Sequence, residues 1–262
     1  MTKLNLYFDY CRLLLLALRS LFSPALSDPK IDKVFHTKAF NYRVHYPFFQ
    51  SFFFSFNEIF CIRDYPPFSN LKNYIDLGSN IGLSILWYHF FNPNLTIYAF
   101  EPDPFMLRFL KKNIKEANIK NCFLFNKAVS DKVGRRKYYR IIDQVQNLDS
   151  GLNLNLPLPF ETLLTSTQKL SPLIKKIGKV SLIKMDIEGE EYRVFEEIFL
   201  TKTINNVEKI FFESHFFKKS EHGSYCSLLS SLKKFGKIET RINSGYTSLN
   251  YWENKNSFPN KS

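Results

Sequence analysis

Acidic side chains stand beside glycines at one point of this sequence, in a spacing that suits nucleotide chemistry. The stretch YIDLGSNIG places Asp76 where an apolar run ends, and Gly78 and Gly82 follow at once. A dinucleotide-binding turn instead reads GxGxxG and offers bare backbone N–H groups to a pyrophosphate. A carboxylate here would repel a pyrophosphate and attract an ammonium or sulfonium group. S-adenosylmethionine fits this requirement, because it carries such cations and no phosphate.

Each residue of the turn has an expected part in holding that ligand. Gly78 lets the backbone bend and approach the methionine portion closely, and Gly82 lets a helix start tight against the sheet. The side-chain amide of Asn80 is expected to bridge polar groups in the loop. The motif alone also allows a purely structural strand-to-helix turn, capped by Ser79 or Asn80.

The next predicted strand supplies a second constraint on the ligand. TIYAFEPDP contains Glu101, 19 residues after Gly82, close to the spacing at which an acidic residue meets ribose hydroxyls. The alternative is that Glu101 caps the helix that begins at Pro104. A third strand, near NKAVSD, is expected to run beside the adenine, with Ala128 and Val129 in contact with it. The predicted cofactor-binding residues are Asp76, Gly78, Asn80, Gly82, Glu101, Ala128 and Val129.

A second acidic group lies where transfer of a sulfonium methyl to an oxygen would need it. Such a displacement needs an acceptor held in line, exclusion of water and a group that handles the hydroxyl proton. Asp186 ends the run SLIKMD, and Glu188 follows it, while Glu213 and His215 alternate on a strand and so point to the same side. We predict Asp186, Glu188 and His215 as catalytic residues, with a carboxylate facing His215 as a general-base arrangement.

These residues also have structural alternatives. Glu190 and Glu191 could simply favour a helix N-terminus, and His215 could be an edge histidine with satisfied hydrogen bonds. A dense acidic group could hold a divalent metal, but no spacing of His or Asp demands one, so we predict no metal site.

Strands and helices alternate through most of the chain. Predicted strands are 72–77, 95–100, 122–126, 179–186, 207–215, 237–242 and 247–253, and predicted helices are 82–91, 104–117, 191–199 and 225–235. Alternation of this kind gives a largely parallel sheet with helices on both faces. The carboxyl ends of such strands form one crevice, where the two acidic groups would meet. A polar stretch at 139–158 interrupts the pattern.

The chain divides into three parts. Residues 1–70 are an N-terminal extension with a helix, a half-buried strand at 40–46, an aromatic-rich packing segment, and a short helical pattern ended by Pro66 and Pro67. The catalytic domain spans 71–253, and 254–262 form a flexible tail. The apolar run within CRLLLLALRSLF, 11–22, is too short to cross a bilayer, so we expect a packed helix, with weak association with a membrane surface as the alternative.

The net charge and the cysteines limit the partners and the cellular location that we expect. The chain has 262 residues and a net charge of +12, so an acidic partner is conceivable, but runs such as 135–137 are interpreted as solvated. The four cysteines are widely spaced and no secretory signal precedes them, which predicts reduced thiols in the cytoplasm.

Five motifs together resemble those of the FkbM family of methyltransferases. They are YIDLGSNIG, IYAFEPDP, NKAVSD, LIKMDIEGEEYRVF and IFFESH, in the family order, between residues 71 and 215. The resemblance implies the class I methyltransferase fold, a Rossmann-like α/β domain with a mostly parallel seven-stranded sheet and helices on both faces. It also implies S-adenosylmethionine as cofactor and O-methylation of a glycan, lipid-linked sugar or natural product. Two positions depart from the family pattern: Ser79 replaces the usual alanine, and Glu161 replaces the usual aspartate of an LDDL motif.

Other functions fit the sequence less well. A nucleic-acid methyltransferase would use the positive charge, yet it would need an NPP[YF]-type motif and would not place the carboxylates of MDIEGEE along a phosphate backbone. A non-catalytic protein that binds adenosylmethionine is disfavoured because the acidic and glycine positions of the cofactor motifs are all present. A NAD-dependent oxidoreductase lacks its glycine pattern. We therefore expect a small-molecule or glycan acceptor and no nucleic acid.

Overall fold

A seven-stranded mixed sheet forms the centre of the protein. The structure is a computed structural model that describes residues 3–20, 28, 30–142, 150–153, 159–215, 221–242 and 247–257. Across the sheet the strands are β11 (Gly236–Ile242), β12 (Thr247–Asn254), β10 (Lys209–His215), β9 (Leu182–Met185), β3 (Asn73–Leu77), β4 (Thr96–Phe100) and β5 (Cys122–Phe125). β12 runs opposite to the other six strands of this sheet, which are parallel to one another. This is the predicted class I methyltransferase fold.

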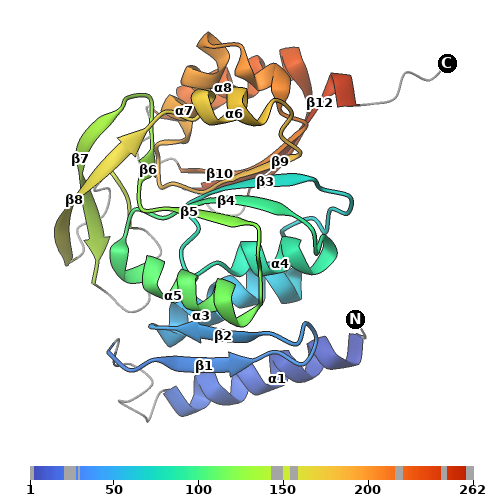
Figure 1. Cartoon of the computed structure of the whole chain (residues 1–262), viewed down its shortest axis with the longest axis vertical. Helices are drawn as coiled ribbons and strands as arrows, with labels where there is room; N and C mark the ends of the chain where they lie inside the picture. The colour runs from blue at the N-terminus through green and yellow to red at the C-terminus, as the bar shows by residue number, and fades with distance from the viewer. Residues whose placement is uncertain are drawn as a thin grey trace.

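Helices cover both faces of the sheet (Figure 1). One face carries α4 (Leu83–Phe91) and α5 (Pro104–Glu116), and the other carries α6 (Ser171–Ile177), α7 (Glu191–Leu200) and α8 (Glu221–Phe235). Each face has its own apolar core, with Trp87 in one and Trp252 in the other. Every strand and helix predicted for the sheet domain is present, with ends shifted by a few residues. Helix α6 and the short turn η3 (Thr203–Asn206) were not predicted.

The chain order creates a switch point at the middle of the sheet. β3 pairs with β4 on one side and with β9 on the other, and all three run parallel. Connections leaving β3 and β9 therefore turn to opposite faces and open a crevice at their carboxyl ends. The residues that follow these strands include those predicted to form the site.

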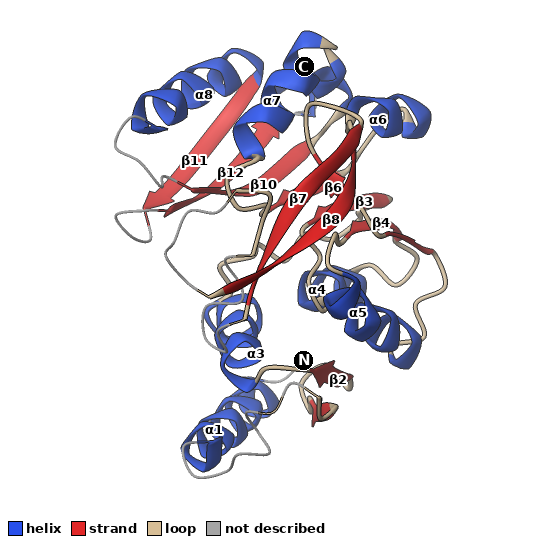
Figure 2. Cartoon of the chain, turned by 90° about the vertical axis from the view of Figure 1, so that its left-hand side faces the viewer, coloured by secondary structure: helices blue, strands red, loops and turns tan. Residues whose placement is uncertain are grey.

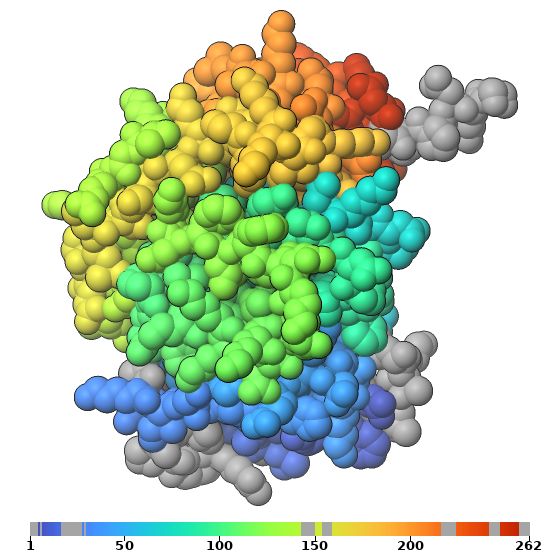
Figure 3. All heavy atoms as spheres, viewed as in Figure 1, coloured from blue at the N-terminus to red at the C-terminus, as the bar shows by residue number. Residues whose placement is uncertain are grey.

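The N-terminal extension packs beneath α4 and α5 and forms one end of the molecule (Figures 1 and 3). It contains α1 (Lys3–Ser20), β1 (Lys33–His36), β2 (Arg43–Tyr46), α3 (Phe49–Phe56) and the π-helical turn η1 (Asn57–Ile62). Its aromatic residues pack on one another, as predicted, with the rings of Tyr46 and Phe52 stacked at 4.2 Å.

Two boundaries within the extension differ from the prediction. The strand predicted at 40–46 begins only at Arg43, because Asn41 adopts a left-handed φ of 56° in the turn after β1. The helical segment ends at Arg63, whose φ of 63° is also left-handed. It therefore stops before Pro66 and Pro67, which were expected to end it.

A second, three-stranded sheet was not predicted. It has the order β6 (Ala128–Val129), β8 (Phe160–Gln168), β7 (Gly134–Ile141), and β7 and β8 cross in front of the main sheet in Figure 2. The basic run 135–137 lies on β7, not in a loop. Residues 143–149 and 154–158 of the polar stretch lie outside the described residues.

The C-terminal end is ordered further than predicted. Asn254 is buried as the last residue of β12, and its Nδ2 donates to the carbonyl oxygen of Val207 at 2.9 Å. The turn η4 (Lys255–Ser257) follows, and 258–262 lie outside the described residues. Among the described residues, no helix is both long and apolar enough to cross a membrane.

Candidate functional site

A cavity of about 300 Å³ opens at the carboxyl ends of β3, β4, β9 and β10. It brings together most of the residues predicted for the site. The predicted residues that line it are Gly78, Asn80, Glu101, Ala128, Val129, Asp186, Glu188 and His215. Asp76 and Gly82 do not line it.

The two glycines owe their identity to contacts with the rest of the protein. Gly78 has φ 78°, and a Cβ there would lie 2.0 Å from the carbonyl oxygen of Asp186. Gly82 has φ 90°, and its Cβ would lie 2.6 Å from a methyl carbon of Leu110 on α5. Gly78 therefore holds the first loop against the end of β9, and Gly82 packs α4 on α5 rather than on the sheet.

The capping alternative for the first loop is wrong. Gly82 occupies the N-cap position of α4, and no side chain caps that helix. The hydroxyl of Ser79 donates to the carbonyl oxygen of Asp76 at 3.1 Å, and the backbone N–H of Asn80 donates to Glu101 at 2.7 Å. The described polar contact of Asn80 thus uses its backbone, not the amide side chain that we predicted.

Asp76 lies behind the cavity rather than in it. Its carboxylate is fully buried, accepts a hydrogen bond from Ser84 at 2.6 Å and lies 3.7 Å from the Nζ of Lys184. Lys184 also donates to the carbonyl oxygen of Gly78 at 2.7 Å and lies 3.3 Å from an oxygen of Asp186. The sequence prediction missed Lys184, although a lysine inside the buried apolar strand LIKM was a visible signal.

Glu101 is held rigidly at the edge of the cavity. Its Oε2 accepts the N–H of Asn80 at 2.7 Å, and its Oε1 accepts the N–H of Asp103 at 2.8 Å. Burial raises the pKa of Glu101 to about 8. Asp103, not Glu101, caps α5, since its side chain accepts the N–H of Phe105. Glu101 is therefore not the helix cap that was the alternative.

The second sheet builds an apolar wall next to Glu101. Ala128 and Val129 are buried and line the cavity, together with Tyr138 and Leu152. Arg140 of β7 binds both oxygens of Asp103 and so fastens this sheet to the start of α5. The cavity therefore has an apolar wall beside the carboxyl group of Glu101.

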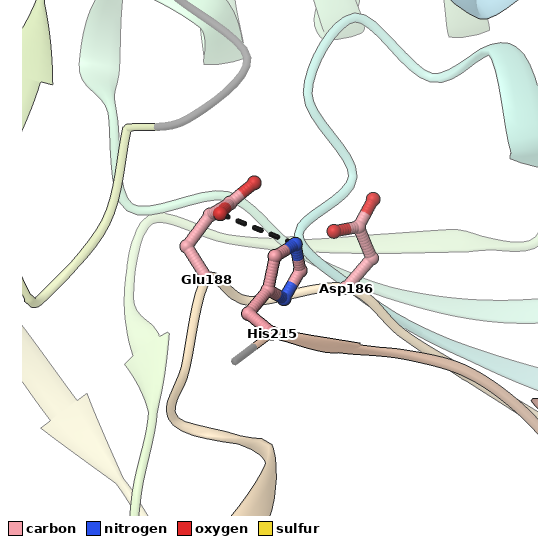
Figure 4. Close-up of side chains that lie close together, drawn as sticks. All are labelled: Asp186, Glu188 and His215. Carbon is pink, nitrogen blue, oxygen red and sulfur yellow. Dashed lines mark ion pairs between the residues drawn. The ribbon is translucent and has the colours of Figure 1, made fainter. Parts of the chain in front are cut away.

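On the opposite side of the cavity, His215 is surrounded by carboxylates (Figure 4). Its Nε2 lies 3.3 Å from Glu188 and 3.9 Å from Glu213, and its Nδ1 lies 3.2 Å from Glu191. Burial lowers the pKa of His215, but Glu188 and Glu191 raise it by more, so it stands well above its usual value. The surrounding carboxylates therefore favour the protonated form of His215.

Glu191 anchors this group. Its two oxygens accept the backbone N–H groups of Ile187 and Gly189, each at 2.9 Å, at the start of α7. Because Glu188 and Gly189 both have left-handed φ angles, the loop turns sharply and aims Glu188 at His215. Glu191 therefore stabilises the N-terminus of a helix, as the structural alternative expected, and it is also the partner of His215.

Asp186, Glu188 and His215 offer ligand atoms that all lie within 4.8 Å of one another. Two carboxylates and an imidazole are a donor set for a divalent cation. The chain spacing gave no sign of this set, since its members follow two different strands. The ammonium of Lys184, 3.3 Å from Asp186, and the proton of His215 both oppose a cation at this point.

The N-terminal extension supplies the remaining wall. Phe48, Phe52, Glu58 and Tyr65 line the cavity, and sequence reasoning assigned none of them to the site. Burial and the nearby carboxylates of Glu213 and Asp186 raise the pKa of Glu58 to about 8. The sequence carried one weak indication, because Ser51, Ser55 and Glu58 fall on one helical face. The cavity that they line, however, is formed largely by distant parts of the chain.

The basic run on β7 is not a solvated loop. Arg136 donates to Glu190 at 2.8 Å, and the hydroxyl of Ser130 donates to the same oxygen at 2.6 Å. Arg135 and Lys137 on the same strand are not buried. The interpretation of this run as solvated was therefore wrong for its central residue.

Comparison with known proteins places this site in a family. The family model described as the methyltransferase FkbM domain matches residues 76–245, well over half of the chain. The 31-O-demethyl-FK506 methyltransferase FkbM of Streptomyces tacrolimicus is 29% identical over 151 residues, which are 45% of this chain and 56% of that protein. The match thus spans little more than half of that relative.

Solved structures of methyltransferases are also similar. The precorrin-6y C5,15-methyltransferase of Geobacter metallireducens GS-15 has a TM-score of 0.41 at 10% identity, covering 71% of this chain and 82% of its own. An rRNA methylase of Streptococcus thermophilus has a TM-score of 0.42 at 10% identity, covering 72% and 89%. With the crevice at the switch point, the ordered motifs and the family match in agreement, the chain belongs to the FkbM family of S-adenosylmethionine-dependent methyltransferases.

Proposed function

We propose that the protein methylates a hydroxyl oxygen of an uncharged small-molecule or glycan acceptor, such as a sugar, a lipid-linked sugar or a natural product. The observation that carries this proposal is the division of the cavity into two unlike ends. Glu101 and an apolar wall form one end, and the acidic residues Asp186, Glu188, Glu213 and Glu58 form the other.

The first end fits the cofactor. Glu101 is fixed by two backbone N–H groups, which leaves lone pairs of both oxygens for ribose hydroxyls. Ala128, Val129 and Tyr138 offer apolar surface to an adenine, and Gly78 brings backbone to the cavity without a side chain. When bound, S-adenosylmethionine supplies an electrophilic methyl group on a sulfonium. Asp76 would act on it only at a distance, since it does not line the cavity.

The second end would hold the acceptor. Asp186 faces the cavity, and Lys184 at 3.3 Å holds its carboxylate in place by an ion pair. We assign to Asp186 the role of orienting the acceptor hydroxyl and taking its proton. We assign to His215 the role of positioning Glu188, 3.3 Å from its Nε2, because the carboxylates around it raise its pKa and favour its protonated form.

Oxygen as the methyl acceptor has a second line of support. The name of the Streptomyces tacrolimicus relative, 31-O-demethyl-FK506 methyltransferase, describes methylation of an oxygen. A carboxylate next to an acceptor suits a hydroxyl, which must lose a proton as it reacts.

A nucleic-acid acceptor is disfavoured by charge. Several carboxyl groups line the acceptor end, and a phosphate backbone passing there would be repelled. We also propose a cytoplasmic location, in keeping with the four free cysteines.

The test uses purified protein and methyl-labelled S-adenosylmethionine. The protein is incubated with separate glycan, lipid and nucleic-acid extracts, and the recovered fractions are analysed by mass spectrometry for the gain of one methyl group. Label on a hydroxyl of a glycan or lipid supports the proposal. Label in nucleic acid refutes the acceptor class, and cofactor binding without transfer to any extract would favour a non-catalytic binding protein.

A further inference from the structure

The described side chains of helix α1 divide into a buried face and an exposed face. Leu13 and Asp9 on its inner side are fully buried. The Asp9 carboxylate accepts the backbone N–H groups of Lys38 at 2.9 Å and Ala39 at 2.8 Å. These contacts determine which side of the helix faces outward.

The outward side is apolar. Tyr7, Phe8, Leu14 and Leu15 are 65%, 47%, 39% and 59% exposed. Helical spacing places the four on one stripe around the half-buried Cys11. We call these four residues the outer stripe. An exposed apolar stripe of this kind marks a surface that meets another apolar phase.

The elements next to α1 add to this apolar surface. Phe54 of α3 and Ile62 of η1 are 51% and 61% exposed, and both elements contact α1. Eight of the 14 large apolar side chains that are exposed in the described part of the chain belong to residues 1–70. The apolar surface is therefore concentrated at the end of the molecule where α1 is the outermost element (Figure 1).

Positive charges flank the outer stripe. The Nζ of Lys38 lies 5.6 Å from the centre of the Phe8 ring, and Arg63 is exposed beside Ile62. The Arg12 side chain is partly exposed, but it lies 3.5 Å from Asp9. The acidic Asp9 is buried beneath the helix. The surface around the stripe is thus cationic as well as apolar.

Charge decides between two possible occupants of this surface. A second copy of the chain would bring one net charge of +12 against another, which opposes self-association through a cationic face. An anionic lipid surface attracts the same cations and accepts the apolar side chains. The combination of apolar stripe and flanking cations fits the lipid surface.

We propose that the outer stripe and its flanking cations dock the protein on an anionic membrane surface, with α1 lying in the plane of the interface. Such a helix buries one apolar face in the headgroup region without spanning the bilayer. α3 packs on α1 and also lines the cavity through Phe52. Docking therefore places the wall of the cavity that the N-terminal extension supplies one helix away from lipid. This inference does not depend on the proposed acceptor.

The test measures co-sedimentation of the full chain with lipid vesicles. We expect binding to vesicles of phosphatidylcholine and phosphatidylserine in equal parts, weaker binding at high salt, and little binding to phosphatidylcholine alone. Leu15→Glu should weaken binding by about tenfold or more, because it puts a charge into the apolar face. Lys38→Gln should weaken it less.

Leu200→Glu is the matched control. Leu200 is 78% exposed on α7, on the other face of the sheet, so this change should leave vesicle binding intact. Thermal melting of each variant establishes that it is folded. Equal loss of binding for both leucine variants, or binding that ignores lipid charge, would overturn the proposal. So would a dimer, measured by light scattering, that Leu15→Glu dissociates in the absence of vesicle binding.

Discussion

The Nη1 atom of Arg136 lies 2.8 Å from the Oε2 atom of Glu190, a carboxylate that is buried. This ion pair joins the second sheet to the start of α7, close to the acidic end of the cavity. Ser130, six residues before Arg136, donates to the same oxygen, so Glu190 joins α7 to a segment of the chain more than 50 residues earlier.

Loss of that cation should destabilise the protein. Arg136→Gln removes the closer of two cations from the buried Glu190 carboxylate and leaves Arg193 at 3.6 Å, so we expect the free energy of unfolding to fall by about 2 kcal/mol. Urea denaturation followed by circular dichroism measures the change. Arg135→Gln and Lys137→Gln on the same strand are the controls, and both should be nearly neutral because neither side chain is buried. Equal effects at all three positions would show that net charge, not this ion pair, matters.

Glu101 should control cofactor affinity. Glu101→Gln keeps the size of the side chain but replaces one carboxyl oxygen with an amide nitrogen, so a ribose hydroxyl loses an acceptor. Calorimetry with S-adenosylhomocysteine should show binding weakened by about 1–3 kcal/mol. Glu161→Gln is the control, because Glu161 is exposed and pairs with Arg140 outside the cavity lining. Tight binding of NAD by the wild type, without binding of the adenosyl ligand, would contradict the cofactor assignment.

Asp186 should separate turnover from cofactor binding. Asp186→Asn removes the proton acceptor but leaves Glu101 and Gly78 unchanged, so turnover should fall roughly 100-fold or more while affinity for S-adenosylhomocysteine stays within a few-fold. Single-turnover transfer and calorimetry give the two quantities. If the variant loses cofactor binding and keeps its turnover per bound cofactor, Asp186 is structural. His215→Gln should not remove a pH dependence near pH 6.5, since the pKa of His215 lies well above that value.

Glu58 should make stability depend on pH. Its pKa is raised from 4.5 to about 8 by burial and by Glu213 and Asp186, so the folded state keeps a proton that the unfolded chain releases near pH 4.5. The stability that this proton provides is full below pH 4.5 and is lost as pH rises through 8. Glu213, with a pKa of about 7, acts in the same direction.

Glu58→Gln should therefore melt at a higher temperature than the wild type at about pH 8, with a smaller difference at about pH 5. Melting curves between these two pH values test this. Glu239→Gln on the exposed strand β11 serves as the control and should follow the wild type at each pH. A wild type that becomes more stable as the solution is made alkaline, with an equal gain in Glu58→Gln, would contradict a stabilising role for the Glu58 proton.

Local patterns explain why much of the fold was predictable. Gly78 and Gly82 mark left-handed backbone positions, and these positions follow from the short-range requirement for a tight turn after a buried strand. The alternation of strand and helix then determines which residues reach the carboxyl edge of the sheet, which is why Glu101, Asp186 and His215 were found in the right crevice.

What was missed depends on partners far away in the sequence. Strand β8 is mostly exposed in its first half and β7 is rich in charge, so neither shows the apolar alternation of a half-buried strand, and each is recognisable only through its pairing with the other. Lys184 and Glu58 are similar cases. Lys184 lies near Asp76 of β3, and Glu58 lies near Asp186 and Glu213, and no local pattern reports such charges from distant parts of the chain.

The reversed strand β12 has a consequence for the order in which the sheet can be completed. It lies between β10 and β11, so β11, although made first, has no partner in the main sheet until Thr247–Asn254 have left the ribosome. Trp252, fully buried, donates from its indole Nε1 to the carbonyl oxygen of Leu232 and thus closes the core under α8. Until then the hydrogen-bonding edge of β10 is open to any passing strand. A chain that ends before Thr247 would therefore leave the edge of β10 unpaired beside the crevice, and β12 is the strand that covers this edge.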